Sequence, residues 1–485
     1  MSMTTSTSVN CSMADPESFD SVRNQIHKAP SMFETLGRRV VTRFLGSFIS
    51  TGCLILQEAD GTDLTFEGSG IKCSLKVHLK IHNPQFYWKV MTRADVGLAE
   101  AYIDGDFSFA DADEGLLNLI MLLIANNSAS KSNKKRGWWT PLLFTATFAS
   151  AKLVYQHVLR QNTLTQARRN ISRHYDLSND MFALFMGETM SYSCGIFKTE
   201  DEDLQTAQLR KFSILIEKAR IEPKQEVLDI GCGWGIFAIE VVKRTGCKYT
   251  GITLSEEQLK FAEKKVKEVG YRTISGFNFA TIVNCLKVDL QLEWRVFSEM
   301  IEHVGHEYME EFFGCCDKLL SEDGLFVLQQ ITEDSRKTDI LKLVASPQFS
   351  SMPDEYYEED RWTAGFIREY IFPGGCLPSF SRVISAMNAA SRLCVEHVEN
   401  IGSHYYHTLR RWRENFLDNQ NKILAMGFDE KFIKKWEYYF DYCAAGFRTY
   451  TLGNYQVVFS RTANIEILQY PYKGFPSAYV HLSTT

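Results

Sequence analysis

The chain has 485 residues, 45% of them hydrophobic, so it is long enough for two or three domains with apolar cores. A formal net charge of −6 over this length argues against a dedicated nucleic-acid-binding protein. The twelve cysteines form no C-x-x-C pair, and no His/Cys cluster has zinc-ligand spacing. We therefore expect no metal site and a reducing, cytoplasmic setting.

The first segment, residues 1–37, is predicted to be disordered, because it is rich in Ser and Thr and poor in large apolar side chains. Its start is polar and contains acids, so we expect no secretory signal in it. Residues 38–125 follow as a small α+β domain, in which stretches such as SLKVHLKIH alternate apolar and polar residues as strands with one wet face do. The longest apolar run, residues 115–125, is too short to span a bilayer.

A basic linker and helix are predicted over residues 126–165. Residues 115–175 contain no Asp or Glu but nine Lys or Arg, interleaved with aromatic residues. Cations next to amphipathic rings suit an anionic lipid surface, so this stretch predicts peripheral association with a phospholipid bilayer. A solvated linker followed by an ordinary helix explains the pattern equally well.

The stretch EVLDIGCGWG, residues 226–235, predicts a buried strand and a tight glycine turn, and a helix follows it. GCKYTGITL then predicts a second strand ending at Thr253, and Ser255 and Gln258 have capping-box spacing at the next helix. This order predicts a doubly wound α/β sheet. The G-C-G-W-G spelling resembles the S-adenosylmethionine-binding turn of class I methyltransferases, although a plain glycine-rich connection remains an alternative.

The rest of the chain, to residue 463, is assigned to the same methyltransferase domain, which begins near residue 166. Residues 271–295 fit a doubly wound order poorly, with no clean strand ending in an acidic turn, and we expect the sheet to lack a strand there. The polar, acidic segment 335–365 predicts a lid or an insertion. Residues 464–485 are an atypical C-terminal tail.

Four side chains are candidates for the chemistry near the carboxyl edge of the sheet: Glu302, His303, Tyr405 and Cys194. A methyl transfer mainly requires proximity and orientation, and a proton acceptor when the product must lose a proton. Three of these candidates also have a non-catalytic interpretation. Glu302 could be an acid favoured by a helix N-terminus, and Cys194 could be a small buried hydrophobe. His303, like the nearby His306, could be a packing or surface residue.

These motifs resemble the cyclopropane-fatty-acyl-phospholipid synthase family, plant type, without the flavin oxidase domain of some members. The matching stretches cover residues 165–270 and 295–460 and include HYDLSNDMF, VLDIGCGWG, EMIEHVGHEYM and ENIGSHYYHTL. The resemblance implies a methyltransferase sheet preceded by a lipid-binding-type domain. It also implies an enzyme that converts a cis double bond of a phospholipid acyl chain into a cyclopropane ring, and that could pair into a homodimer.

The resemblance further implies S-adenosylmethionine as cofactor and a bound bicarbonate as proton acceptor. The bicarbonate would be held by Glu302, Tyr405, Gln329 and the backbone at Cys194 and Ile331. The cofactor contacts carried over by motif are Tyr192, Ser193, Gly231, Gly233, Thr253 and Gln258. Tyr370 and Phe372 are candidates for aromatic faces that stabilise a developing cation.

Two further hypotheses remain open. Alkaloid N-methyltransferases share these motifs, so the substrate could be a small amine. Alternatively, the irregular residues 271–295 break the cofactor site, and the chain is a non-catalytic lipid-binding relic. At Gln329 bacterial members of the family carry a histidine; glutamine can still donate a hydrogen bond to bicarbonate but cannot ionise.

Overall fold

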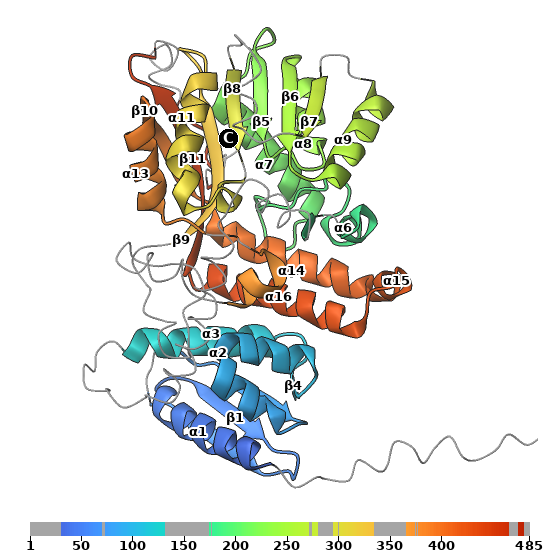
Figure 1. Ribbon diagram of the computed structural model, residues 1–485, viewed down its shortest axis with the longest axis vertical. Helices are drawn as coiled ribbons and strands as arrows, with labels where there is room; N and C mark the ends of the chain where they lie inside the picture. The colour runs from blue at the N-terminus through green and yellow to red at the C-terminus, as the bar shows by residue number, and fades with distance from the viewer. Residues whose placement is uncertain are drawn as a thin grey trace, which may run out of the picture.

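Three tiers make up the structure in Figure 1: a sheet with its helices, a layer of two long helices, and an N-terminal α+β unit. This computed structural model describes a set of ranges with gaps between them. They are residues 31–69, 73–130, 174–175, 177–270, 274–279, 294–298, 300–333, 365–373, 375, 377–464 and 474–479.

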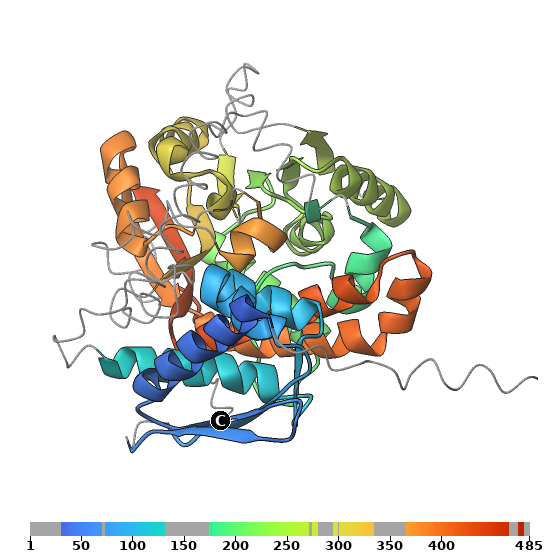
Figure 2. The same cartoon turned by 60° about the horizontal axis from the view of Figure 1, so that its bottom comes forward.

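The N-terminal unit packs α1 (Met32–Phe48), α2 (Gln85–Ile103) and α3 (Gly115–Ser130) on a sheet, which Figure 2 shows edge-on. Within the described residues the sheet order is β2-β1-β3-β4. Its strands are β1 (Cys53–Gln57), β2 (Asp63–Glu67), β3 (Lys76–Ile81) and β4 (Phe107–Phe109). The apolar positions of the alternating stretches face α1 and α3, because successive strand residues point to opposite faces.

Two predicted boundaries of this unit are wrong. Disorder was expected to residue 37, but α1 begins at Met32, where Ser31 and Glu34 form a reciprocal capping box. The linker was expected from residue 126, but α3 continues to Ser130, and the buried Asn126 side chain bonds the backbone of Ser50 and Thr51.

The middle tier consists of α14 (Gly402–Asp418) and α16 (Glu430–Arg448), joined through α15 (Gln420–Ala425). One side of α16 packs on α2 and α3, and α14 packs on α6 (Asn179–Met186) below the sheet. Aromatic side chains fill the junction, including Phe185, Trp412 and Trp436. This layer therefore joins the N-terminal unit to the sheet.

Seven strands form the large sheet within the described residues, in the order β10-β11-β9-β8-β5-β6-β7. All neighbours pair in parallel except β11, which is antiparallel to both β9 and β10. The bounds are β5 (Glu226–Ile230), β6 (Lys248–Thr253), β7 (Ile274–Phe279), β8 (Trp294–Ser298), β9 (Phe326–Glu333), β10 (Leu393–Asn400) and β11 (Leu452–Arg461). The order reverses between β5 and β8, and in open α/β sheets ligands bind at this reversal.

Helices cover both faces of this sheet, as the doubly wound prediction requires. One face carries α7 (Leu204–Ala219), α8 (Ile236–Thr245) and α9 (Glu256–Val269); the other carries α11 (Met309–Leu319) and α13 (Phe380–Ala390). Short turns follow β8 and precede α13: η2 (Ile301–His303), η3 (His306–Tyr308) and the π-turn η4 (Ile367–Ile371).

The expected loss of a strand between residues 271 and 295 is wrong. Residues Ile274–Phe279 form β7, the edge strand, which pairs in parallel with β6. An edge strand needs only one hydrogen-bonded neighbour, so a sequence without the usual apolar pattern can still occupy that position. The residues directly after β7, where no acidic turn was expected, the basic stretch 131–173 and most of the predicted lid lie outside the described residues.

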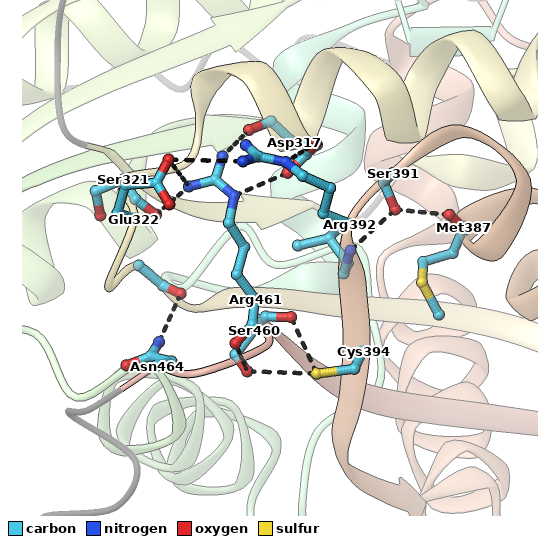
Figure 3. A network of polar contacts seen from close by, with 12 residues as sticks. Asp317, Ser321, Glu322, Met387, Ser391, Arg392, Cys394, Ser460, Arg461 and Asn464 are labelled. Carbon is cyan, nitrogen blue, oxygen red and sulfur yellow. Dashed lines mark hydrogen bonds and ion pairs between the residues drawn. The ribbon is translucent and has the colours of Figure 1, made fainter.

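An ion-pair network fixes the end of β11 to the α11 side of the sheet. The buried Arg461 guanidinium donates to the Asp317 carboxylate at 2.9 Å and to the Ser321 carbonyl at 2.7 Å (Figure 3). Arg392 reaches the same Asp317 carboxylate at 3.2 Å. Asn464 then bonds the Asp323 carbonyl at 3.0 Å, which aligns the chain as it leaves the sheet.

The C-terminal tail returns to the sheet at residues 474–479. Ser477 and the Ala478 amide both donate to the Glu399 carboxylate on β10. The Tyr479 hydroxyl donates to the Asn400 carbonyl at 2.7 Å. The part of the chain that the structure describes contains no helix long and apolar enough to cross a membrane.

The start of α16 offers a test of local stability. Asp429 caps this helix by accepting from the Phe432 amide at 2.8 Å. We expect Asp429→Ala to lower the free energy of unfolding by about 1 kcal/mol, because the amide loses its acceptor. Asp429→Asn keeps an acceptor and should change it by only about a few tenths of that value. Urea denaturation would measure both; equal losses in the two variants would contradict the capping role.

Candidate active site

Two adjoining cavities lie at the carboxyl edge of the parallel strands. The first, here called the cofactor cavity, has a volume of about 240 Å³ and is bordered by the glycine turn after β5. The second, the inner cavity, has about 140 Å³ and is bordered by the ends of β8 and β9 and by α14 and α16. Tyr175, Tyr192, His303 and Gln329 line both cavities, so the two spaces meet at these side chains.

The glycine turn opens the cofactor cavity. Gly231, Gly233 and Gly235 have φ values of 94°, 55° and 78°, a left-handed region that glycine adopts without a steric penalty. A Cβ at Gly233 would meet no atom within 4 Å, so that face of the turn is open. The backbone can therefore approach a ligand closely between β5 and the start of α8.

The end of β6 supplies a polar pair to the same cavity. The buried Thr253 hydroxyl donates to the Gln258 side-chain oxygen at 2.7 Å. Ser255 caps α9 by accepting from the Gln258 amide, as the spacing predicts. The amide group of Gln258 is thereby held at the cavity wall, where it can bind hydroxyl groups of a ligand.

A buried lysine in the cofactor cavity was not predicted. Lys211 on α7 donates to the hydroxyls of Ser191 and Ser193 at 2.7 and 2.5 Å. Its position carried a signal, because Lys211 and Lys218 are seven residues apart on the face of α7 that also holds Leu204 and Leu215. A charge repeated on an apolar helical face indicates a buried, paired cation.

The inner cavity contains most of the predicted catalytic set. The Glu302 carboxylate accepts from the Ile331 backbone amide at 2.6 Å, which joins the turn after β8 to the end of β9. Tyr405 lines the same cavity from α14, and its hydroxyl has no hydrogen-bond partner among the described residues. Cys194 does not line either cavity; its buried thiol donates toward the Ile401 carbonyl.

Aromatic rings form much of the wall between the cavities. Tyr192 donates to the Tyr439 hydroxyl at 3.1 Å, and Phe372 packs near both rings. Burial raises the pKa of Tyr405 well above its ordinary value, so its phenol stays neutral. Burial lowers the pKa of His303 to about 4, so this imidazole is neutral at physiological pH.

The prediction for Tyr370 is wrong. This residue does not border either cavity among the described residues; its hydroxyl donates to Glu100 of α2 at 2.6 Å. Arg93 of α2 also pairs with Glu369 at 3.0 Å. The π-turn that carries Ile367 and Arg368 into the inner cavity is therefore tied to the N-terminal unit.

A chain of buried polar groups connects the sheet interior with Gln329. Lys218 donates to Glu399 at 2.7 Å and to the Gln456 side-chain oxygen at 2.8 Å. The Gln456 amide then donates to the Gln329 side-chain oxygen at 2.7 Å. Burial opposes ionisation of Glu399, but the nearby His397 imidazole and the hydrogen bonds from Lys218 and Ser477 prevail and lower its pKa to about 2.

Comparisons with known proteins agree with this geometry. The family model described as mycolic acid cyclopropane synthetase matches residues 162–457. The chain is 30% identical to the cyclopropane-fatty-acyl-phospholipid synthase of Escherichia coli strain K12, over 82% of this chain and 91% of that protein. It is 32% identical to a tuberculostearic acid methyltransferase of Mycobacterium tuberculosis, over 78% and 82% of the two chains.

Solved structures show the same fold. The mycolic acid cyclopropane synthase CmaA1, solved with SAH and CTAB, has a TM-score of 0.52 and 29% identity, covering 61% of this chain and 98% of that one. Coclaurine N-methyltransferase has a TM-score of 0.53 at 20% identity over 76% of this chain and 99% of that one, which indicates fold alone. The sheet is thus a class I methyltransferase sheet, as the sequence predicts.

The ion pair of Glu399 and Lys218 should make stability depend on pH. The Glu399 pKa falls from 4.5 to about 2 on folding, so its contribution is complete above pH 4.5 and is lost as the pH falls toward 2. We expect Glu399→Gln to lower the free energy of unfolding at pH 7 by about 3–5 kcal/mol, because Lys218 stays buried without its anion.

The same variant should also show a shallower fall in stability below pH 4.5 than the wild type. Urea denaturation across that pH range measures both effects. An unchanged slope would mean that Glu399 ionises alike in the folded and unfolded chains.

Proposed function

Because this chain belongs to the family described as mycolic acid cyclopropane synthetase, whose members are S-adenosylmethionine-dependent methyltransferases, we propose a specific reaction for it. It transfers a methylene group from S-adenosylmethionine to a cis double bond of an unsaturated phospholipid acyl chain. The product is a cyclopropane fatty acid. The observation that carries this proposal is the meeting of a cofactor cavity and an aromatic inner cavity beside Glu302 and Tyr405.

The residues of the cofactor cavity fit S-adenosylmethionine. The open face at Gly233 leaves room that a side chain would fill, and Gly231 and Gly233 are the predicted contacts there. Thr253 and Gln258 stand at the end of the second strand, where this fold receives the ribose of a nucleoside. Tyr192 and Ser193, the remaining predicted contacts, line the inner cavity next to it.

The inner cavity fits a small oxyanion such as bicarbonate. Its donors are the neutral Tyr405 phenol, which has no partner among the described residues, and the Gln329 amide. Glu302 can accept a hydrogen bond from the oxyanion's own hydroxyl group. These residues would hold the bicarbonate, which would supply a proton acceptor. Cys194 borders neither cavity, so its predicted backbone contact lies outside this proposal, and the Ile331 backbone amide donates to Glu302 instead.

The residues of the chain then position the reaction. S-adenosylmethionine supplies an electrophilic methyl group when bound. Transfer of that methyl to an alkene carbon would break its bond to sulfur and would leave a positive charge on the acyl chain. The faces of Tyr175, Tyr192 and Phe372 can stabilise that charge. A proton of the transferred methyl would then leave toward the oxyanion site that Glu302 and Tyr405 border, and the electron pair of the broken C–H bond would close the ring.

The apolar walls of the inner cavity suit a hydrocarbon chain, with Leu377, Leu409, Phe447 and Leu452 among its lining residues. A lipid substrate requires access to a bilayer. At the start of α1, Met32, Phe33 and Leu36 are 86%, 62% and 51% exposed, on a helix that also carries Arg38 and Arg39. Such a surface suits docking on anionic headgroups, so we infer a cytoplasmic protein that binds membranes peripherally.

The reaction can be tested directly. The chain is incubated with methyl-labelled S-adenosylmethionine and vesicles of dioleoyl phospholipid, and the acyl chains are examined by mass spectrometry. We expect a labelled ring-bearing acyl chain. A labelled amine with no ring-bearing acyl chain would overturn the proposal in favour of an N-methyltransferase. Cofactor binding without any product would do so as well.

The glycine turn gives a paired test of the cofactor site. Gly233→Ala places a methyl group on the open face and strains a backbone with φ of 55°. We expect the Kd for S-adenosylmethionine to rise by about tenfold or more. Gly246 has a similarly positive φ of 71° and an equally open Cβ position but ends α8 outside both cavities. Gly246→Ala should therefore leave the Kd unchanged, and calorimetric titration measures both; equal losses would contradict the assignment.

Glu302 gives a test of the proton acceptor site. We expect Glu302→Gln to lower kcat for cyclopropane formation by roughly 100-fold or more, because a neutral amide binds the hydroxyl group of the proton-accepting oxyanion more weakly than a carboxylate does. The Kd for S-adenosylmethionine should stay the same, since Glu302 lines only the inner cavity. Single-turnover kinetics with labelled cofactor separates the two effects. A variant with full kcat would remove Glu302 from the chemistry.

A further inference from the structure

Gln329 lies where the two cavities meet, and the direction of its side-chain amide decides what the inner cavity offers a ligand. A glutamine amide has an accepting oxygen at one end and a donating NH₂ group at the other. Turned one way, Gln329 would present a donor to the cavity; turned the other way, it would present an acceptor. The residues behind it settle this direction.

The starting point is Lys218, which is fully buried within α7. An ammonium group donates hydrogen bonds and cannot accept them. Its two partners must therefore be acceptors, and these are the Glu399 carboxylate and the Gln456 side chain. Gln456 is also fully buried, so its oxygen must face Lys218 and its NH₂ group must face away from it.

The NH₂ group of Gln456 lies 2.7 Å from the side chain of Gln329. Because that group is a donor, the atom of Gln329 that receives it must be the oxygen. The NH₂ group of Gln329 is then the end left for the cavities, and it has no hydrogen-bond partner among the described residues.

We propose that Lys218 and Gln456 are positioning residues that fix Gln329 as a hydrogen-bond donor toward the inner cavity, and so give that cavity its preference for a small oxyanion. Reversal of Gln329 would leave two NH₂ groups facing each other in a buried place, which is unfavourable. Lys218 and Gln456, here called the relay, therefore fix which end of the Gln329 amide faces the inner cavity. Neither of these two side chains lines that cavity. This deepens the proposed function, on which the identity of the oxyanion rests.

The anion partner of Lys218 completes the relay. Glu399 is held by Lys218 on one oxygen and by Ser477 and the Ala478 amide on the other. This keeps the carboxylate in place, so it remains available as the counter-ion of Lys218. The ammonium thus stays charged in an interior position, where an unpaired cation would lose its proton.

The decisive variant is Gln456→Glu, which keeps the shape of the side chain but leaves it with acceptors only. Lys218 can still donate to it, while Gln329 must now turn and donate to the new carboxylate. The cavity then receives the Gln329 oxygen in place of its NH₂ group. We expect the Kd for ¹³C-labelled bicarbonate, measured by NMR line broadening on the full chain, to rise by about tenfold to hundredfold.

The Kd for S-adenosylmethionine should change by less than about twofold in the same variant, a separation that a general structural defect would not produce. Bicarbonate binding equal to that of the wild type, in a folded Gln456→Glu chain, would overturn the relay. Gln420→Glu, which adds the same charge at the exposed start of α15, is the matched control and should bind bicarbonate normally.

A second variant decides the matter if Gln456→Glu fails to fold. Gln329→Glu still accepts from Gln456 but presents an oxygen to the cavity, so it should lose bicarbonate to a similar extent; unchanged affinity overturns the proposal. The Kd for bicarbonate can be measured whether or not the chain forms a cyclopropane product. A wild-type chain that binds bicarbonate, with both variants losing it, but that forms no ring-bearing acyl chain would support the relay and overturn the proposed function.

Discussion

The reversal of strand order between β5 and β8 is the constraint on which the rest of the structure depends. Connections from these two neighbouring strands leave in opposite directions, so their carboxyl ends cannot be covered by one helix. The glycine turn occupies one side of the resulting crevice, and the turn with Glu302 occupies the other. The bond from Glu302 to the Ile331 amide then joins this second side to β9. Both cavities exist because the sheet is ordered in this way.

Much of this arrangement could be predicted from local sequence. The glycine turn, the capped α9 and the apolar runs of β5, β6 and β9 carry their own short-range signals. Glu302 and Tyr405 were candidates from their expected places at the carboxyl edge of the sheet, and the family resemblance added their role beside an oxyanion. They are about a hundred residues apart in the chain and line one cavity. Local patterns fail where a role depends on a distant partner. Tyr370 was predicted to present its ring to the site, but its hydroxyl donates to Glu100 of α2 and the residue lines neither cavity.

Two further features show why the rest of the fold and of the site could not be predicted from the sequence. β7 forms from residues with no strand-like pattern, because pairing with β6 supplies what the sequence lacks. The polar chain behind Gln329 draws on α7, β9, β10 and β11, and no spacing along the sequence relates these four elements. In the sequence, only the repeat of Lys211 and Lys218 on an apolar helical face indicates that buried cations with polar partners are present. A cation in such a position therefore predicts acceptor groups on other elements of the fold, as Glu399 and Gln456 are for Lys218.

The π-turn η4 is attached to α2, and this attachment limits where the chain can be cut into fragments that keep the site intact. Ile367 and Arg368 line the inner cavity, yet the flanking Glu369 and Tyr370 are anchored to Arg93 and Glu100. A fragment that kept the whole methyltransferase sheet but omitted the N-terminal unit would lose both anchors. The smallest piece of this protein that keeps the inner cavity intact is therefore larger than the methyltransferase sheet with its helices, and the N-terminal unit is a structural support of that cavity.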